Sequence, residues 1–240
     1  MCYNDNVKKE VIELIYLENV SKCYKNGVNA LENINLQIND GEFVYIIGPT
    51  GSGKSTLIKL LDGEEIPTTG SVNVEGYNVG KIKHSKVPYY RRNIGVVFQD
   101  FRLLPHLTIF ENISFALEAL GKDKGEIRRR VREVLDLVDL VDKAKSFPNQ
   151  LSGGQQQRAT IARAIANKPK VLIADEPTGN LDPEKSNEIL ELLEKINVEE
   201  GTTVLMVTHD FTLVNKYKKR TISLEQGNVS ADSAKGGYFR

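Results

Sequence analysis

Residues 48–56 read Gly48-Pro49-Thr50-Gly51-Ser52-Gly53-Lys54-Ser55-Thr56, and this stretch decides the fold. It matches the phosphate-binding pattern G-x-x-x-x-G-K-[ST] at every fixed position. The run before it, Glu42–Ile47, is short and apolar as a buried strand is, and Lys54–Leu61 after it has the apolar spacing of a helix. The stretch therefore stands between a strand and a helix, which is the setting that a phosphate-binding loop requires.

The residue types in this loop indicate how it holds a nucleotide. Gly48, Gly51 and Gly53 let the backbone curl so that successive N–H groups point toward a polyphosphate, and the helix N-terminus adds a positive dipole. Lys54 supplies a charge for the β- and γ-phosphates, and the Ser55 hydroxyl supplies an oxygen ligand for Mg²⁺. We therefore expect all of residues 48–56 to contact ATP.

Two adjacent carboxylates follow another predicted strand. The run Lys170–Ala174 is apolar and ends in Asp175 and Glu176. Such a pair at the end of a central strand is costly unless it binds a cation or does chemistry. We expect Asp175 to reach Mg²⁺ directly or through water, and Glu176, pointing to the opposite side, to act as the general base toward the attacking water.

Other polar residues stand where a ligand could meet them. Gln99 follows the predicted strand Ile94–Phe98, and His209 follows the predicted strand Thr203–Val207. Ligands bind at the carboxyl ends of parallel strands, but taken alone these two positions favour a surface glutamine and a loop histidine. Tyr24, between the first two predicted strands, fits either a half-buried tyrosine or a platform for a purine base.

A second candidate anion site lies in Leu151-Ser152-Gly153-Gly154-Gln155, which runs into a predicted helix over Ala159–Asn167. Ser152 can cap the helix, and the two glycines allow a ligand to approach the backbone closely. A helix N-terminus attracts anions. The pattern thus predicts a second place where phosphate can bind.

Composition limits the classes of partner. The chain has 240 residues with 32 Lys and Arg against 32 Asp and Glu, so no overall charge draws it to nucleic acid, and none is expected as a partner. It has only two cysteines, which fits a reducing compartment and no disulfide framework. No apolar run approaches the roughly 18 residues of a membrane-spanning helix. We therefore expect any membrane work to go through a partner.

The pattern of elements predicts one α/β domain over 15–230 between two peripheral segments. Residues 1–14 are expected to form a loose extension and 231–240 a frayed tail. Amphipathic helical spacing over Thr108–Ala144 indicates a helical subdomain at about 100–168. Ile222–Val229 is expected to close the chain as an edge hairpin.

Taken in order, these motifs resemble the ABC-transporter ATPases. The LSGGQ-type signature at 151–155 distinguishes this group of ATPases from other families with the same phosphate loop, which lack it. The resemblance runs from about Ile15 to Val229. It implies a P-loop NTPase of the ABC type, which is an α/β fold with a RecA-like core, an antiparallel β subdomain and a helical subdomain. It also implies ATP hydrolysis with Mg²⁺ as cofactor.

The resemblance implies roles for individual residues. Tyr24 resembles the aromatic residue that stacks on adenine, and Gln99 the glutamine that touches Mg²⁺ and senses a membrane partner. Asp182 resembles the D-loop aspartate, and His209 the switch histidine. With Lys54 and Glu176, Gln99 and His209 make up the expected catalytic set. The residues expected to complete the ATP site of a second protomer are Ser152, Gly153, Gly154 and Gln155.

Within this superfamily, three stretches resemble the FtsE family of cell-division ATPases: Val87–Leu104, Asp142–Pro148 and Ala174–Asp182, with Ala234–Tyr238 in the tail. One feature departs from that family. Gln155-Gln156-Gln157 stands where FtsE often has Glu-Gln-Gln, and the triple glutamine is frequent in lipoprotein-release and MacB-type ATPases. Both assignments therefore stay open, beside a weaker third in which the chain acts on DNA or ribosomes without a membrane partner.

The FtsE resemblance implies a specific assembly. The chain would form a homodimer on binding ATP, lie peripherally on the cytoplasmic face of the cell membrane at the division septum, and drive the polytopic membrane protein FtsX. Through FtsX it would regulate peptidoglycan hydrolases. The alternative is an exporter of the lipoprotein-release or MacB type. We expect the membrane partner to dock around Phe101–Pro105.

Overall fold

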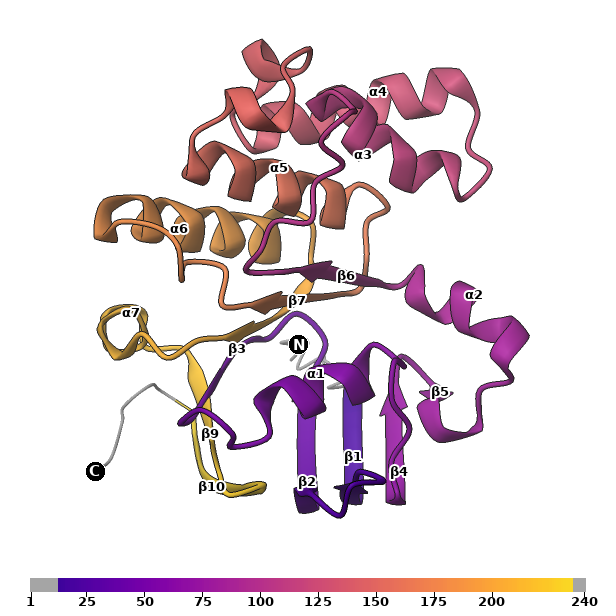
Figure 1. Cartoon of the computed structure of the whole chain (residues 1–240), viewed down its shortest axis with the longest axis vertical. Coiled ribbons are helices and arrows are strands. Elements are labelled where there is room, and N and C mark those ends of the chain that lie inside the picture. The colour runs from indigo at the N-terminus through magenta and orange to yellow at the C-terminus, as the bar shows by residue number, and fades with distance from the viewer. Residues whose placement is uncertain (1–12, 235–240) are drawn as a thin grey trace, which may run out of the picture.

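The structure is a computed structural model that describes residues 13–234. Within these residues the larger of two sheets has six strands in the order β10-β9-β3-β8-β7-β6, and all are parallel except β10 (Figure 1). The strands are β3 (Phe43–Ile47), β6 (Ile94–Val97), β7 (Val171–Asp175), β8 (Thr203–Val207), β9 (Arg220–Glu225) and β10 (Asn228–Ser233). Because β3, β7 and β8 are neighbours, the polar residues that follow them meet at one edge of the sheet.

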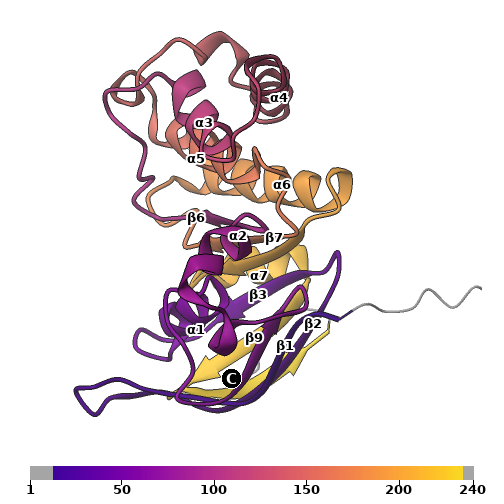
Figure 2. The ribbon, with the colours of Figure 1, turned by 90° about the vertical axis from the view of Figure 1, so that its right-hand side faces the viewer.

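The smaller sheet is antiparallel and has the order β2-β1-β4-β5. Its strands are β1 (Glu13–Cys23), β2 (Asn29–Asn39), β4 (Thr69–Val74) and β5 (Tyr77–Asn78). The helix α1 (Lys54–Leu61) packs beside it, and its buried Leu57 and Leu60 join one core with residues of both sheets (Figure 2). The phosphate loop, which joins β3 to α1, is thereby anchored at both ends in buried elements.

The remaining helices lie mostly on the other side of the six-stranded sheet. Figure 1 shows α3, α4 and α5 stacked at one end of the molecule, with α6 between them and the strands. The helices are α2 (Val87–Arg91), α3 (Ile109–Glu118), α4 (Lys124–Leu137), α5 (Gly153–Ile165), α6 (Pro183–Glu199) and α7 (Phe211–Tyr217). Short 3-10 turns occupy Val79–Lys81, His84–Lys86, Val141–Lys143 and Pro148–Gln150.

The central strands β3, β7 and β8 are mostly apolar because each buries both faces. Along β8, Val204 and Met206 join the core under α5 and α6, whereas Leu205 and Val207 join the core against α1. Successive strand residues point to opposite faces of a sheet, so a strand covered on both sides reads as a continuous apolar run. This explains why these strands were predictable and confirms the expected α/β class.

The helical region agrees with the sequence pattern except at its last helix. Thr108 caps α3 through a capping box with Glu111, and Asp123 caps α4. The helix predicted over Ala159–Asn167 was placed too late: α5 begins at Gly153, directly after its cap Ser152. The two glycines of the signature are therefore the first turn of the helix rather than a loop before it.

The chain ends differ from expectation at two boundaries. Residues 13 and 14 belong to β1, and the rest of the expected extension, 1–12, lies outside the described residues, as does 235–240. The frayed tail expected from 231 is wrong for 231–233, because β10 runs to Ser233 and Asp232 pairs with the Arg220 guanidinium at 2.7 Å. Among residues 13–234, no helix combines the length and apolarity that crossing a membrane takes.

Candidate functional site

The phosphate loop adopts a conformation that only glycine tolerates at two positions. Gly48 has φ 150° and Gly53 has φ 105°, both in the region that L side chains avoid. A Cβ at Gly53 would lie 2.6 Å from the Ala30 carbonyl oxygen. Gly53 also caps α1, and no side chain accepts from the first N–H groups of that helix. Those donors therefore remain for an anion.

The substitution Gly48→Ala tests this conformation. The added Cβ would collide with the Leu224 carbonyl and lie 2.7 Å from Ser52 Oγ, so the loop must shift away from β9. We expect at least a tenfold weaker affinity for ATP, measured by titration of a fluorescent analogue. Gly76→Ala is the matched control, because Gly76 also has a positive φ but nothing lies within 4 Å of its Cβ position. Equal affinity of the two variants would contradict the close fit of the loop.

Lys54 lies across the loop at the start of α1. Its Nζ donates to the carbonyl oxygens of Gly48 and Pro49, each at 2.8 Å. Burial lowers the pKa of Lys54, while the nearby carboxylates of Glu176 and Asp175 act to raise it. The ammonium is thus placed between the loop backbone and the acidic pair, where it can exchange carbonyl contacts for phosphate oxygens.

Glu176 and His209 meet at the edge of the sheet. His209 Nδ1 lies 2.7 Å from Glu176 Oε2, although 33 residues separate them in the chain. The Glu176 N–H donates to the Val207 carbonyl at 2.9 Å, which ties the end of β7 to β8. The Glu176 side chain is only 16% exposed, against 69% for His209. The histidine therefore contacts one oxygen of the Glu176 carboxylate from a more exposed position.

Asp175 is a partly buried carboxylate at the end of β7. Burial raises its pKa, as does the negative charge of Glu176, and the Lys54 ammonium only partly offsets this. Among residues 13–234, no group of three or more His, Cys, Asp and Glu side chains could hold a metal ion alone. The oxygens of Asp175, Ser55 and Gln99 suit Mg²⁺, which in such sites takes few protein ligands and the rest from phosphate and water.

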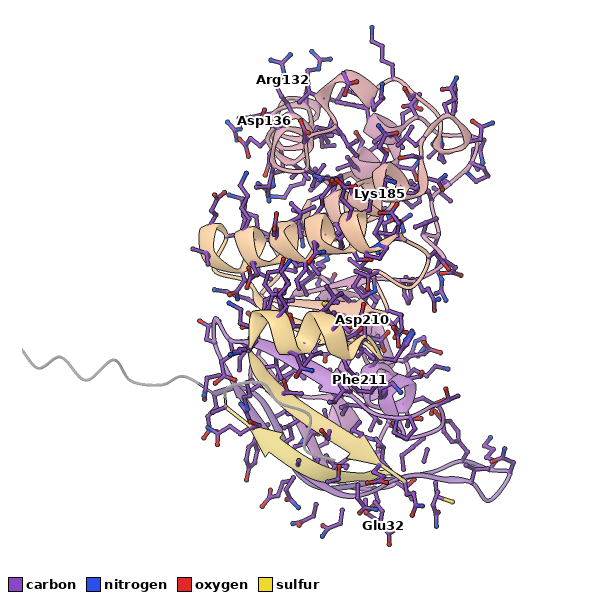
Figure 3. All side chains as sticks on the ribbon, turned by 90° about the vertical axis from the view of Figure 1, so that its left-hand side faces the viewer. Glu32, Arg132, Asp136, Lys185, Asp210 and Phe211 are labelled. Carbon is purple, nitrogen blue, oxygen red and sulfur yellow. The ribbon has the colours of Figure 1, made fainter. Side chains whose placement is uncertain are left out.

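A cavity of about 750 Å³ joins the phosphate loop, Lys54, Glu176 and His209, whereas Ser55, Gln99 and Asp175 do not line it. The expected residues that line it are Gly48, Pro49, Thr50, Lys54, Glu176 and His209. The rest of the wall comes from residues that sequence reasoning missed, namely Phe211, Thr221, Ser223, Leu224, Glu225, Ser230, Ala231 and Ser233. Figure 3 shows Asp210 and Phe211 at the start of α7. One sequence signal could have located α7 in this wall. Asp210 is a residue type that caps helices, and it caps α7 by accepting from the Thr212 and Leu213 N–H groups.

Tyr24 lies apart from this cavity but is joined to α1. Its hydroxyl is 3.3 Å from Thr56 Oγ1, and the Lys22 ammonium lies 5.3 Å from its ring centroid. Tyr24 lines a separate depression of about 410 Å³ with Lys22 and Glu65, which form an ion pair at 2.6 Å. A half-buried ring beside the phosphate loop is compatible with stacking on a base.

The signature and the D-loop form a second group. Ser152 Oγ accepts from the Gln155 N–H, and Gln155 Oε1 accepts from the Ser152 N–H at 3.0 Å, so the Gln155 side chain is engaged with its own helix. Asp182 caps α6 and pairs with Lys185 at 2.6 Å. The Lys185 stem lies across Gly154, where a Cβ would be 3.0 Å from its Cδ. None of 152–155 or 182 lines the 750 Å³ cavity described above.

Gln99 contacts the loop that precedes Asp182. Its side-chain amide lies against Gly179, where a Cβ would be 2.8 Å from Nε2, and its carbonyl accepts from Asn180 Nδ2 at 3.0 Å. The side chain is exposed. The structure therefore brings most of the expected residues together in two places: the phosphate cavity, and a surface formed by the signature, Asp182 and the neighbourhood of Gln99. Tyr24 lines a separate depression.

Comparison with known proteins finds relatives that match nearly the whole chain. Residues 31–179 match the family described as ABC transporter. The cell division ATP-binding protein FtsE of Bacillus subtilis is 53% identical over 94% of this chain and 98% of its own length. FtsE of Escherichia coli K12 is 46% identical over 90% of this chain and 97% of its own.

Solved structures agree with the sequence relatives. An ATP-binding cassette in a dimeric, post-hydrolysis state bound to ADP and Pi has a TM-score of 0.83 and 41% identity, covering 94% of this chain and all of that one. CbiO1 of Clostridium perfringens, part of an ABC transporter complex, has a TM-score of 0.87 and 31% identity over 93% of this chain and 89% of its own. This chain is an ATPase of the ABC transporter family and, within it, belongs to the FtsE family of cell-division ATP-binding proteins.

Proposed function

We propose that this ATPase hydrolyses ATP between two protomers and drives the membrane protein FtsX, regulating peptidoglycan hydrolases at the division septum from the cytoplasmic face of the membrane. The observation that supports the catalytic part is the meeting of Lys54, Glu176 and His209 in one cavity at the N-terminus of α1. The relatives named FtsE support the cellular role.

In the proposed reaction the chain mainly positions charges. Lys54 and the N–H groups of the phosphate loop hold the β- and γ-phosphates, and Glu176 accepts a proton from the attacking water. His209 keeps the Glu176 carboxylate oriented through their 2.7 Å contact. Bound Mg²⁺, held by Ser55, Asp175 and Gln99, would neutralise charge on the phosphates. Tyr24 would stack on the adenine.

Two copies are needed because each copy keeps its signature away from its own phosphates. Ser152, Gly153, Gly154 and Gln155 lie outside the cavity that contains Lys54, so we propose that they contact the γ-phosphate held by a second copy, with Asp182 at the same interface. The N-terminus of α5 supplies the positive dipole for this contact. The similar cassette solved as a dimer with ADP and Pi supports this arrangement.

The dimer proposal predicts how hydrolysis depends on protein concentration. If each ATP site needs two protomers, the activity per mole of protein rises with concentration until the dimer is saturated. We expect a more than linear increase of total activity in a dilution series at saturating ATP. Gly154→Glu, which places a carboxylate at the signature, should remove most of the activity while leaving ATP binding by the phosphate loop. A strictly linear dependence from a stable monomer would contradict the two-protomer site.

The membrane partner is tested by capture from solubilised membranes. Tagged chain carrying Glu176→Gln is incubated with ATP, and bound proteins are identified by mass spectrometry, with Lys54→Ala as the nucleotide-binding control. An FtsX-like protein in the first sample supports the division role. A permease of the lipoprotein-release or MacB type, which Gln155-Gln156-Gln157 favours, would replace FtsX as the partner. Absence of any membrane protein would contradict both.

A further inference from the structure

The loop between β1 and β2 carries Tyr24, and it projects from the body of the molecule (Figure 2). Its backbone closes a short turn, in which the Tyr24 N–H donates to the Val28 carbonyl at 2.9 Å and the Gly27 N–H donates to the Tyr24 carbonyl at 2.9 Å. These bonds fix the backbone of the loop, but the side-chain rotamer of Tyr24 is set separately. The direction of the ring therefore depends on the side chains around it.

Lys22, two residues before the ring, is buried and engages three groups. Its Nζ donates to Glu65 Oε2 at 2.6 Å and to the Ile66 carbonyl at 2.8 Å. The same ammonium lies over the Tyr24 ring, 5.3 Å from the ring centroid. A cation within about 6 Å of the centroid is attracted to the face of an aromatic ring. The ammonium therefore occupies one face of the Tyr24 ring.

The partners of Lys22 belong to the segment that follows α1. The Glu65 N–H donates to the Lys59 carbonyl at 2.9 Å, which ties this segment to the last turn of the helix. At the other end of α1, the Tyr24 hydroxyl lies 3.3 Å from Thr56 Oγ1. The ring is thus connected to both ends of the helix that begins at the phosphate loop.

A charged residue at this position is not explained by packing. The buried residues of β1 are Leu14, Ile15, Leu17, Val20 and Lys22, so within this strand the lysine interrupts an otherwise apolar set. Replacing a buried ion pair by apolar residues of similar size often leaves stability unchanged or raises it. An apolar residue would therefore serve the fold as well as Lys22 does, and the charge needs another reason.

We propose that the Lys22–Glu65 pair positions the Tyr24 ring for nucleotide binding, with one ring face covered by the ammonium and the other open to the adenine. Lys22 acts through the ring and does not contact the nucleotide itself. Because a nucleotide spans from the ring to the phosphate loop, a ring that is fixed before binding reduces the ordering that binding would otherwise require. The inference rests on the proposed stacking of adenine on Tyr24 and adds the residues that orient the ring.

Two ligands, one with a base and one without, test the pair. The affinities of the full chain for ADP and for inorganic pyrophosphate, both with Mg²⁺, are measured by displacement of a ribose-labelled fluorescent ADP. Lys22→Met keeps an unbranched side chain but removes the charge, and Glu65 retains access to water because its side chain is 31% exposed. Lys219→Met is the matched control, because Lys219 also pairs with a glutamate, Glu194 at 2.7 Å, and lies over an aromatic ring, 5.9 Å from the Phe43 centroid.

We expect Lys22→Met to raise Kd for ADP about fivefold or more and to leave Kd for pyrophosphate within about twofold, because the contribution lost is stacking of the base on the ring. Lys219→Met should leave both affinities at the parent value. Glu65→Gln, which keeps the size of the side chain but removes its charge, should weaken ADP binding selectively as well, and it decides the question if Lys22→Met does not fold. Equal weakening of both ligands would make the pair a general support of the fold and overturn the inference.

A double variant shows whether Lys22 acts through the ring. Tyr24→Ala should by itself weaken ADP binding, and adding Lys22→Met to it should cause little further change, because both side chains act through one contact. Additive effects would mean that Lys22 acts independently of the ring, and would overturn the positioning role. Normal ADP affinity in Lys22→Met beside a weakened one in Tyr24→Ala would also overturn it and leave the proposed stacking standing. If Tyr24→Ala binds ADP as the parent does, the proposed stacking fails, and this inference fails with it.

Discussion

Replacing Glu176 with glutamine is expected to slow ATP hydrolysis by about 10²–10⁴-fold, which is the usual contribution of a positioned general base. The amide keeps the size of the side chain and one oxygen for His209, but it cannot accept the proton of the attacking water. Binding of ATP should remain, because phosphate is held by Lys54 and the loop backbone. Two protomers with uncleaved ATP should then accumulate as dimer.

The measurement separates three quantities: phosphate release in steady state, ATP affinity by titration, and dimer by size-exclusion chromatography with light scattering. Glu32→Gln is the matched control, because Glu32 is exposed on β2 at the bottom of Figure 3, outside the cavity. It should leave all three quantities unchanged. Turnover near the parent rate in Glu176→Gln would remove Glu176 from its proposed role and require another base.

The sequence predicts correctly those elements whose signal lies within a few consecutive residues. The phosphate loop has fixed spacing, and strands such as Thr203–Val207 are buried on both faces, so their apolar runs match the observed bounds. Short and polar elements lack such a signal. The helix α7 has only seven residues, and β10 reads as a polar tail although it pairs with β9 and its Asp232 binds Arg220.

Contacts between distant parts of the chain were not predictable from one sequence. The Glu176–His209 pair depends on β7 and β8 being neighbours in the sheet, which the order of motifs alone does not fix. The part of the cavity wall formed by β9 follows from its parallel pairing with β3, where Ile47 lies opposite Ser223. The bonds from Arg163 to the Phe101–Arg102 backbone arise from the packing of α5 beside that loop.

Removing the Lys54 side chain, in Lys54→Ala, is expected to weaken ATP binding itself. Hydrogen bonds to charged groups are each worth about 1.5–3 kcal/mol, and about 1.4 kcal/mol corresponds to a factor of ten in affinity. The free protein also loses two bonds, from Lys54 Nζ to the Gly48 and Pro49 carbonyls, which offsets part of this. We therefore expect Kd for ATP to rise roughly tenfold to a hundredfold.

The control for this prediction lies on the same helix. Lys59 is on α1 but faces solvent and pairs with Glu64 at 3.3 Å, so Lys59→Ala removes the same chemical group without touching the loop. An exposed pair of this kind contributes little, and ATP affinity should stay at the parent level. Since Lys54 also lies close enough to Asp175 and Glu176 for their charges to act on it, its removal takes a cation away from both carboxylates. An unchanged Kd in Lys54→Ala would mean that the loop backbone alone holds the phosphates.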